Sequence, residues 1–178
     1  MMRHHSYLRS SAFAGLVACG AATLFSALAP AAQAAATDDA CALLTQAKVS
    51  AALGVKVDAG KRPVESDPTF CNWRESGKSE GPARNVVVNL LHVDQFEQGK
   101  QPSRNLKESI SGVGDEAYFF QPTRLPVNLF VKAGSVYFKI MARSSVTDPA
   151  AEQNRTIDKA LAAEIIKKLQ SSPAKPAA

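Results

Sequence analysis

The chain has 178 residues, of which 46% are hydrophobic and 21% are charged, and its formal net charge at pH 7 is +5. This balance excludes an intrinsically disordered chain, which combines low hydrophobicity with high net charge, and a polytopic membrane protein, which needs several long apolar spans. The length fits one globular domain.

The first 36 residues have the three parts of a secretory signal peptide. Two arginines precede an apolar run over residues 12–28, and small residues follow that run. The segment Ala32-Gln33-Ala34 matches the small-x-small pattern of signal peptidase sites. We therefore expect a signal peptide over residues 1–34, with Ala36 as the alternative cleavage point, and export to the periplasm or the cell exterior.

Cys19 offers a second interpretation of the leader. Leu16-Val17-Ala18-Cys19 resembles a lipobox, in which Cys19 would be lipidated and would become the new N-terminus. The chain stays apolar after Cys19, whereas the tether of a lipoprotein is usually polar. We therefore favour cleavage after Ala34, and we do not expect an integral membrane protein.

Removal of the leader leaves Cys41 and Cys71 as the only cysteines. It also removes two arginines from the 21 basic residues, so 19 face 16 acidic ones and the net charge falls to +3, which does not by itself require an acidic partner. An even number of cysteines in an oxidising compartment predicts a Cys41–Cys71 disulfide. The alternative, a metal or catalytic thiol, lacks partners, because the mature chain has one histidine, His92, and no C-x-x-C motif.

The N-terminal part of the mature chain carries clear helix signals. Residues 38–44 predict a short helical turn that Asp39 caps, and Thr45 is a good N-cap for a helix over residues 46–53. Gly54 stands where a left-handed residue ends a helix. A short strand over residues 55–57 and a surface loop over residues 58–68 follow.

The middle of the chain predicts a β-hairpin across residues 70–93. Its second arm, residues 86–93, is nearly continuously apolar, which is typical of a central strand covered on both faces and thus of helices on both faces of the sheet. Residues 94–110 predict a broken helix that Asp94 caps. Gly99 and Pro102 interrupt this helix, and Leu106 and Ile110 continue it as an i, i+4 pair.

The C-terminal part predicts three strands and a long helix. A turn over residues 111–115 leads to a strand over residues 116–121, and strands over residues 127–132 and 135–142 form a hairpin around Ala133-Gly134. In the last strand, Val136, Phe138 and Ile140 share one face. The closing helix follows Asp148-Pro149 and repeats Ile157, Leu161, Ile165 and Leu169 every four residues.

These elements predict an α+β fold in which an antiparallel β-sheet packs with N-terminal and C-terminal helices. We expect a single domain over residues 35–170 and a flexible tail over residues 171–178.

Several short motifs occur in an order that resembles a loose family of exported or lipid-anchored bacterial envelope domains of unknown function. They are Cys41-x-Leu43-Leu44-Thr45, Cys71-x-Trp73, Gly112-x-Gly114-Asp115-Glu116-Ala117-Tyr118 and the helix that contains Ala160-Leu161-Ala162. The resemblance implies an antiparallel sheet packed with helices, a cysteine bridge and no catalytic site to transfer. The order of elements is also similar to a PsbP-like or Mog1-like architecture.

Five residues are candidates for ligand binding. His92 is expected on a strand, where it shares a face with Val86, Val88 and Leu90, and without an orienting carboxylate we favour a structural role for it. Asp115 and Glu116 follow two glycines that we interpret as turn residues, with Asp115 bonded to neighbouring amides. The candidates are Trp73, His92, Asp115, Glu116 and Tyr118, although packing in the core is the more ordinary role for Trp73 beside a disulfide.

The sequence contains no motif for a serine hydrolase, a metal site or a dinucleotide site. The serines lie in no G-x-S-x-G or S-x-x-K pattern, no metal-ligand spacing occurs, and the glycines lack the third member and the following helix of a dinucleotide site. We expect no metal, no cofactor and no nucleic-acid partner. We interpret two groups of basic residues as a solvated surface, not as a binding patch: Lys100, Arg104 and Lys107, and Lys61-Arg62. The motif Asn154-Arg155-Thr156 favours a helix cap or helix surface over a glycosylation site.

The sequence therefore favours a monomeric, secreted or periplasmic binding module without catalytic activity, whose partner is a protein or a small-molecule ligand of the cell envelope. Two alternatives stay open. One is an envelope hydrolase that uses His92 with Asp115 or Glu116, and the other is an inhibitor or immunity-type partner of another exported protein.

Overall fold

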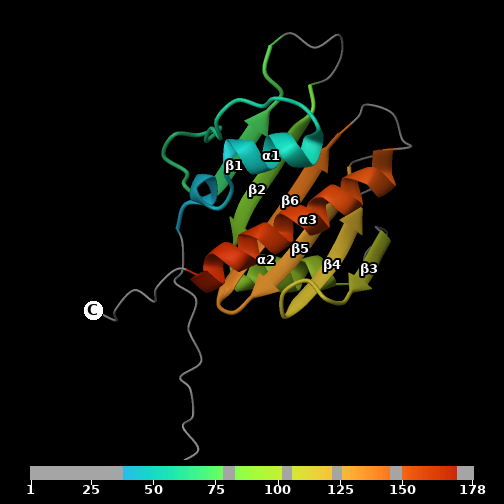
Figure 1. The fold of residues 1–178 in the computed structure, drawn as a ribbon. Coiled ribbons are helices and arrows are strands. Elements are labelled where there is room, and N and C mark those ends of the chain that lie inside the picture. The colour runs from blue at the N-terminus through green and yellow to red at the C-terminus, as the bar shows by residue number, and fades with distance from the viewer. Residues whose placement is uncertain (1–37, 78–82, 102–105, 122–125, 145–149, 172–178) are drawn as a thin grey trace, which may run out of the picture. The chain divides into compact units, whose positions relative to one another are not determined.

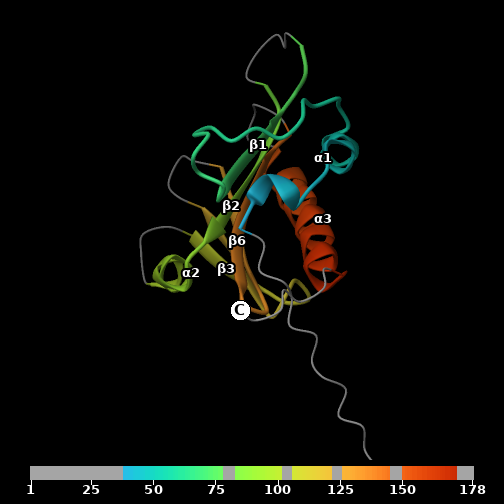
Figure 2. The same ribbon diagram turned by 90° about the vertical axis from the view of Figure 1, so that its left-hand side faces the viewer.

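A six-stranded antiparallel sheet with helices on both faces forms the centre of the fold (Figures 1 and 2). The computed structural model describes residues 38–77, 83–101, 106–121, 126–144 and 150–171, which all belong to one compact unit. The expected signal peptide and most of the expected tail lie outside these residues. The strands stand in the order β1-β2-β6-β5-β4-β3. In chain order the elements are η1 (Ala40–Ala42), α1 (Gln46–Leu53), β1 (Phe70–Arg74), β2 (Asn85–Leu91), α2 (Val93–Lys100), β3 (Leu106–Ile110), β4 (Glu116–Gln121), β5 (Asn128–Ala133), β6 (Val136–Arg143) and α3 (Ala150–Ser171).

The main core lies between the sheet and the layer that contains η1, α1 and α3. Figure 2 shows α1 and α3 on one side of the sheet and α2 on the other. Along β6, every second side chain is buried from Val136 to Ala142, and these meet the apolar stripe of α3. The α+β fold is thus confirmed, as is the stripe of Ile157, Leu161, Ile165 and Leu169, all of which are buried.

A disulfide between Cys41 and Cys71 joins η1 to β1, as the sequence predicts, with 5.0 Å between the two Cα atoms. The Asp39 carboxylate accepts a hydrogen bond from the Cys41 N–H at 3.0 Å, which caps η1. The Thr45 hydroxyl caps α1 by accepting from the Lys48 N–H, and Gly54 ends that helix with a φ of +67°. These predictions are confirmed to the residue.

Residues 55–57 form no strand of the sheet, contrary to the prediction. Val57 makes one isolated bridge with Glu75, and Lys61 makes another with Asn72. The alternation of Val55 and Val57 comes from packing on the core, since Val57 is fully buried and Val55 is partly buried. This segment lies along the outer edge of β1.

Residues 106–110 form the edge strand β3, whereas the sequence predicts a helix there. Leu106 and Ile110 are four residues apart, a spacing that fits one face of a strand as well as one face of a helix. Pairing with β4 decides the outcome, with Ile110 opposite Ala117. Pro102 and Arg104 lie outside the described residues.

Strand β2 ends at Leu91, and His92 is the N-cap of α2, so the predicted strand end at residue 93 and the predicted cap at Asp94 are both wrong. The His92 N–H donates to Gln95 Oε1 at 2.9 Å. Helices on both sheet faces are confirmed, but β2 is not covered on both faces, because buried and partly exposed side chains alternate along it. Val86 and Val88 are buried, while Val87 and Asn89 are partly exposed.

Two buried polar side chains anchor α3 to the end of β6. Asp158 Oδ1 accepts from the Ala142 N–H at 2.7 Å, and Asn154 Oδ1 accepts from the N–H and the hydroxyl of Ser144 at 2.8 and 2.7 Å. Asn154 is therefore a buried anchor inside α3, which corrects the expected cap or helix surface at this motif. Within the described chain, Asp158 Oδ2 is buried without a hydrogen-bond partner. Burial raises the pKa of the Asp158 carboxyl well above its ordinary value, against the opposing effect of the Ala142 N–H.

Replacing Asp158 by asparagine keeps an oxygen acceptor for Ala142 and removes the ionisable group. A carboxyl whose pKa rises on folding stabilises the fold fully below its unfolded pKa, and this contribution is lost as pH rises through the folded pKa. We therefore expect D158N to gain stability relative to the wild type as pH rises above about 4, the ordinary pKa of an aspartate. Urea unfolding at several pH values measures this difference. Asp38→Asn, at an exposed position, is the matched control, and an equal pH trend in both variants would contradict the prediction.

Candidate functional site

Trp73 lies in the main core, apart from the other candidate residues. Its side chain is 1% exposed, and a Cβ atom at Gly60 would stand 2.7 Å from the indole Cε2. The side chain points to the same face as the buried Cys71, two residues earlier on β1. The packing role that the sequence favours for Trp73 agrees with this burial.

His92 lies at the start of α2, whereas Glu116, on β4, lies beside the end of that helix. His92 is exposed at the start of the helix, whereas Lys100, its last residue, forms an ion pair with Glu116. Eight residues of α-helix span about 12 Å, so the structure does not bring these two candidates together. His92 also does not share a strand face with Val86 and Val88, which corrects the sequence-based placement.

Asp115 ties two turns together. Its carboxylate accepts from the Gly134 N–H at 2.6 Å, and its own N–H donates to the Lys132 carbonyl at 2.8 Å. Gly112 and Gly114 adopt φ values of +81° and +62°, which favour glycine. The interpretation of these glycines as turn residues is confirmed, but the Asp115 carboxylate bonds an amide of a distant turn instead of its neighbours in the chain.

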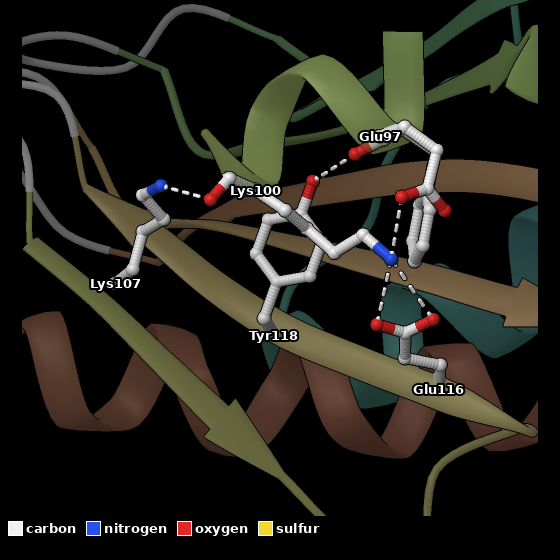
Figure 3. Close-up of polar contacts among 6 residues, drawn as sticks. Glu97, Lys100, Lys107, Glu116 and Tyr118 are labelled. Carbon is white, nitrogen blue, oxygen red and sulfur yellow. Dashed lines mark hydrogen bonds and ion pairs between the residues drawn. The ribbon is translucent and has the colours of Figure 1, made fainter. Parts of the chain in front are cut away.

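Charged side chains fasten the C-terminal end of α2 to the sheet, in an arrangement we call the α2 clasp (Figure 3). Lys100 Nζ lies 2.7 Å from Glu97 Oε2 and 2.9 Å from Glu116 Oε1. The hydrogen bonds to Glu97 and Glu116 raise the pKa of Lys100. Lys107, on β3, donates from Nζ to the Lys100 carbonyl at 2.6 Å and also to the Gln101 carbonyl. Lys100 and Lys107 thus hold the helix end instead of lying on one solvated helix face.

Aromatic side chains complete the α2 clasp beneath the helix. Phe96 is fully buried, with its ring centroid 5.3 Å from those of both Tyr118 and Tyr137, and Tyr118 stacks on Phe130 at 4.9 Å. The Tyr118 hydroxyl donates to the Phe96 carbonyl at 2.8 Å. Burial raises the pKa of Tyr118, so its hydroxyl stays protonated at neutral pH and serves as a donor. Among the candidates, Glu116 and Tyr118 come together here, in contacts that hold the fold.

Beyond α2, the same face of the sheet carries polar side chains on three neighbouring strands. Residues that pair across an antiparallel sheet point to the same side of it. One such cross-strand row consists of Arg74 on β1, Asn85 on β2 and Arg143 on β6. Asn89 is opposite Lys139. All are exposed or partly exposed. We call this surface the open sheet face and define it by six residues: Asn72, Arg74, Asn85, Asn89, Lys139 and Arg143.

The open sheet face is positively charged. Arg74, Lys139 and Arg143 form no ion pair among the described residues. Glu75, which follows Arg74 in the chain, is held by the Arg84 guanidinium in two contacts of 3.1 and 2.9 Å, and its pKa is lowered by these hydrogen bonds. The Glu75 carboxylate is therefore paired with Arg84 and forms no ion pair with Arg74.

The sequence candidates include none of these six residues. Polar residues at every second position, as at Asn72 and Arg74, are a signal of a solvent-facing strand surface, and Asn85 and Asn89 share one face of β2 with the apolar Val87 between them. These residues share a surface with Arg143 only because β2 pairs with β6, and the two strands are distant in the chain.

Comparisons with protein-family models, curated proteins and solved structures give no match for this chain. The resemblance to exported envelope domains therefore stays a prediction. Within the described ranges, no helix is both long enough and apolar enough to span a bilayer. The same part of the chain holds no group of three or more His, Cys, Asp or Glu residues suited to a metal ion.

Proposed function

We propose that this chain is an exported binding module, periplasmic or extracellular, that acts without catalysis and contacts its ligand through the open sheet face. The observation that carries the proposal is the set of three positive side chains on this face, Arg74, Lys139 and Arg143, which have no ion-pair partner among the described residues. Charged side chains held on a sheet without partners are ready to pair with a ligand.

The other candidate residues, Asp115, Glu116 and Tyr118, use their polar groups in contacts within the fold. Asp115 accepts from a turn amide, Glu116 pairs with Lys100, and the Tyr118 hydroxyl donates to a helix carbonyl. Each of these polar groups holds part of the fold. A hydrolase built on His92 would need Glu116 or Asp115 beside it, and α2 separates His92 from Glu116.

Retention on the envelope of the source cell tests the proposal. The secreted form of the chain is mixed with the washed, insoluble envelope fraction, and the bound amount is measured against protein concentration. We expect the triple variant R74Q/K139Q/R143Q to bind at least about tenfold more weakly than the wild type, because charged hydrogen bonds are lost.

The matched control removes three positive charges from other surfaces. Lys56, Lys159 and Lys167 are exposed and lie outside the open sheet face, so K56Q/K159Q/K167Q should be retained like the wild type. Circular dichroism checks that both variants are folded. The proposal is wrong if the wild type is not retained, or if the two variants lose retention equally.

A further inference from the structure

We infer that the ligand of the open sheet face is an acidic polysaccharide, a linear chain of sugars that carry carboxylates. This inference rests on the proposed function and names the ligand class. It depends on the spread of the three positive side chains, on the asparagine amides of the same face and on the aromatic ring of Phe70 beside them.

The three positive side chains start from well-separated positions on the sheet. Arg74 and Arg143 are two strands apart, which places their Cα atoms about 10 Å apart across the sheet. Lys139 precedes Arg143 by four residues on β6, about 13 Å along the strand. A ligand that carries several anionic groups along an extended chain matches this spread of positions. The planar guanidinium fork matches a carboxylate with two parallel hydrogen bonds.

Asn85 stands between Arg74 and Arg143, and the next cross-strand row consists of Asn72, Val87 and Met141. Asn85 Nδ2 donates to Asn72 Oδ1 at 3.3 Å, which leaves Asn85 Oδ1 as an acceptor and Asn72 Nδ2 as a donor on the same surface. The Asn89 side chain stands beside Lys139 on the neighbouring strand. An amide both donates and accepts hydrogen bonds, as a hydroxyl does, so these groups complement a ligand rich in hydroxyls.

Aromatic rings lie at both ends of one cross-strand row. Phe70 is opposite Asn89, Asn89 is opposite Lys139, and Lys139 is opposite Phe130. Phe70 is partly exposed and offers apolar ring surface beside polar groups, whereas the Phe130 ring stacks on Tyr118 in the α2 clasp. Sugar rings present apolar C–H faces together with hydroxyls, whereas an acidic peptide would supply the carboxylates without the hydroxyls. The combination favours a carboxylated polysaccharide.

Calorimetric titration with defined polymers tests the inference. The probes are soluble polygalacturonate, poly-L-glutamate of equal charge and chain length, polyphosphate and the neutral glucan dextran. We expect polygalacturonate to bind at least about tenfold more tightly than polyglutamate or polyphosphate, because its hydroxyls and ring faces add contacts with the asparagine amides and Phe70 to the carboxylate pairs. We expect dextran to bind at least about tenfold more weakly than polygalacturonate, because it carries no carboxylates.

Two variants separate the contributions of charge and amide. R74Q/R143Q should weaken binding of every anionic polymer, while N72A/N89A should remove the preference for polygalacturonate over polyglutamate and leave the weaker charge-driven binding. K159Q/K167Q, which changes two exposed helix residues, should match the wild type. Equal affinity for polygalacturonate and polyglutamate, or tighter binding of polyglutamate or polyphosphate, would overturn the ligand class.

The two proposals fail in distinguishable ways. If polygalacturonate does not bind but envelope retention still depends on Arg74, Lys139 and Arg143, the polysaccharide inference is wrong and the binding-module proposal stands. If envelope retention is also independent of these residues, both are wrong.

Discussion

Replacing Cys41 and Cys71 together by serine is expected to lower the free energy of unfolding by about 3 to 4 kcal/mol. The bond closes a loop between residues 30 positions apart in sequence, and it joins η1 to β1 at the edge of the sheet. Without it the unfolded chain gains conformational entropy, which destabilises the fold. Domains of this size are usually stable by about 5 to 15 kcal/mol, so the loss is large. Urea unfolding followed by circular dichroism measures it.

Reductant provides the matched control for the double variant. The wild type in reductant should unfold at a lower urea concentration than the oxidised wild type but no lower than C41S/C71S, because a thiol suits the fully buried position 71 better than a hydroxyl. Reductant should not change the variant further. A variant as stable as the oxidised wild type would show that the disulfide does not stabilise this fold.

Replacing Trp73 by alanine is expected to cost about 3 to 5 kcal/mol, because the side chain is 1% exposed and its removal leaves a large cavity. Trp73→Phe keeps part of the apolar volume and should cost less. The comparison is Val64→Ala, which truncates an apolar side chain that is 59% exposed and should change stability by less than about 0.5 kcal/mol.

Trp73→Phe also separates packing from binding. If Trp73 is a core residue alone, the folded variant should keep the envelope retention of the wild type. Loss of retention in a folded W73F protein would restore Trp73 as a ligand-binding residue.

Local signals predict the helices at the ends of the domain well. Thr45 and Gly54 cap α1 at the predicted residues, and the four-residue repeat from Ile157 defines the buried stripe of α3. The β5–β6 hairpin follows from alternating residues around Gly134, whose φ is +60°. In each case the information lies within one element or one turn.

Features that depend on distant pairing could not be predicted from the sequence. Leu106 and Ile110 fit a helix or a strand until β4 pairs with them. Arg74 and Arg143 join one surface only because β2 lies between β1 and β6, an order that no local pattern specifies. Candidate residues chosen for reactive side chains, such as Glu116, proved to hold the α2 clasp.

Backbone amide NMR of the labelled, secreted form of the chain, titrated with the soluble carbohydrate fraction of the source envelope, tests the central claim most directly. The account predicts that the largest shift changes cluster on β1, β2 and β6, around Asn72, Arg74, Asn85, Asn89, Lys139 and Arg143. Shift changes that instead centre on α1, α3 or the α2 clasp would contradict a binding role for the open sheet face, and no shift changes at all would contradict a carbohydrate ligand.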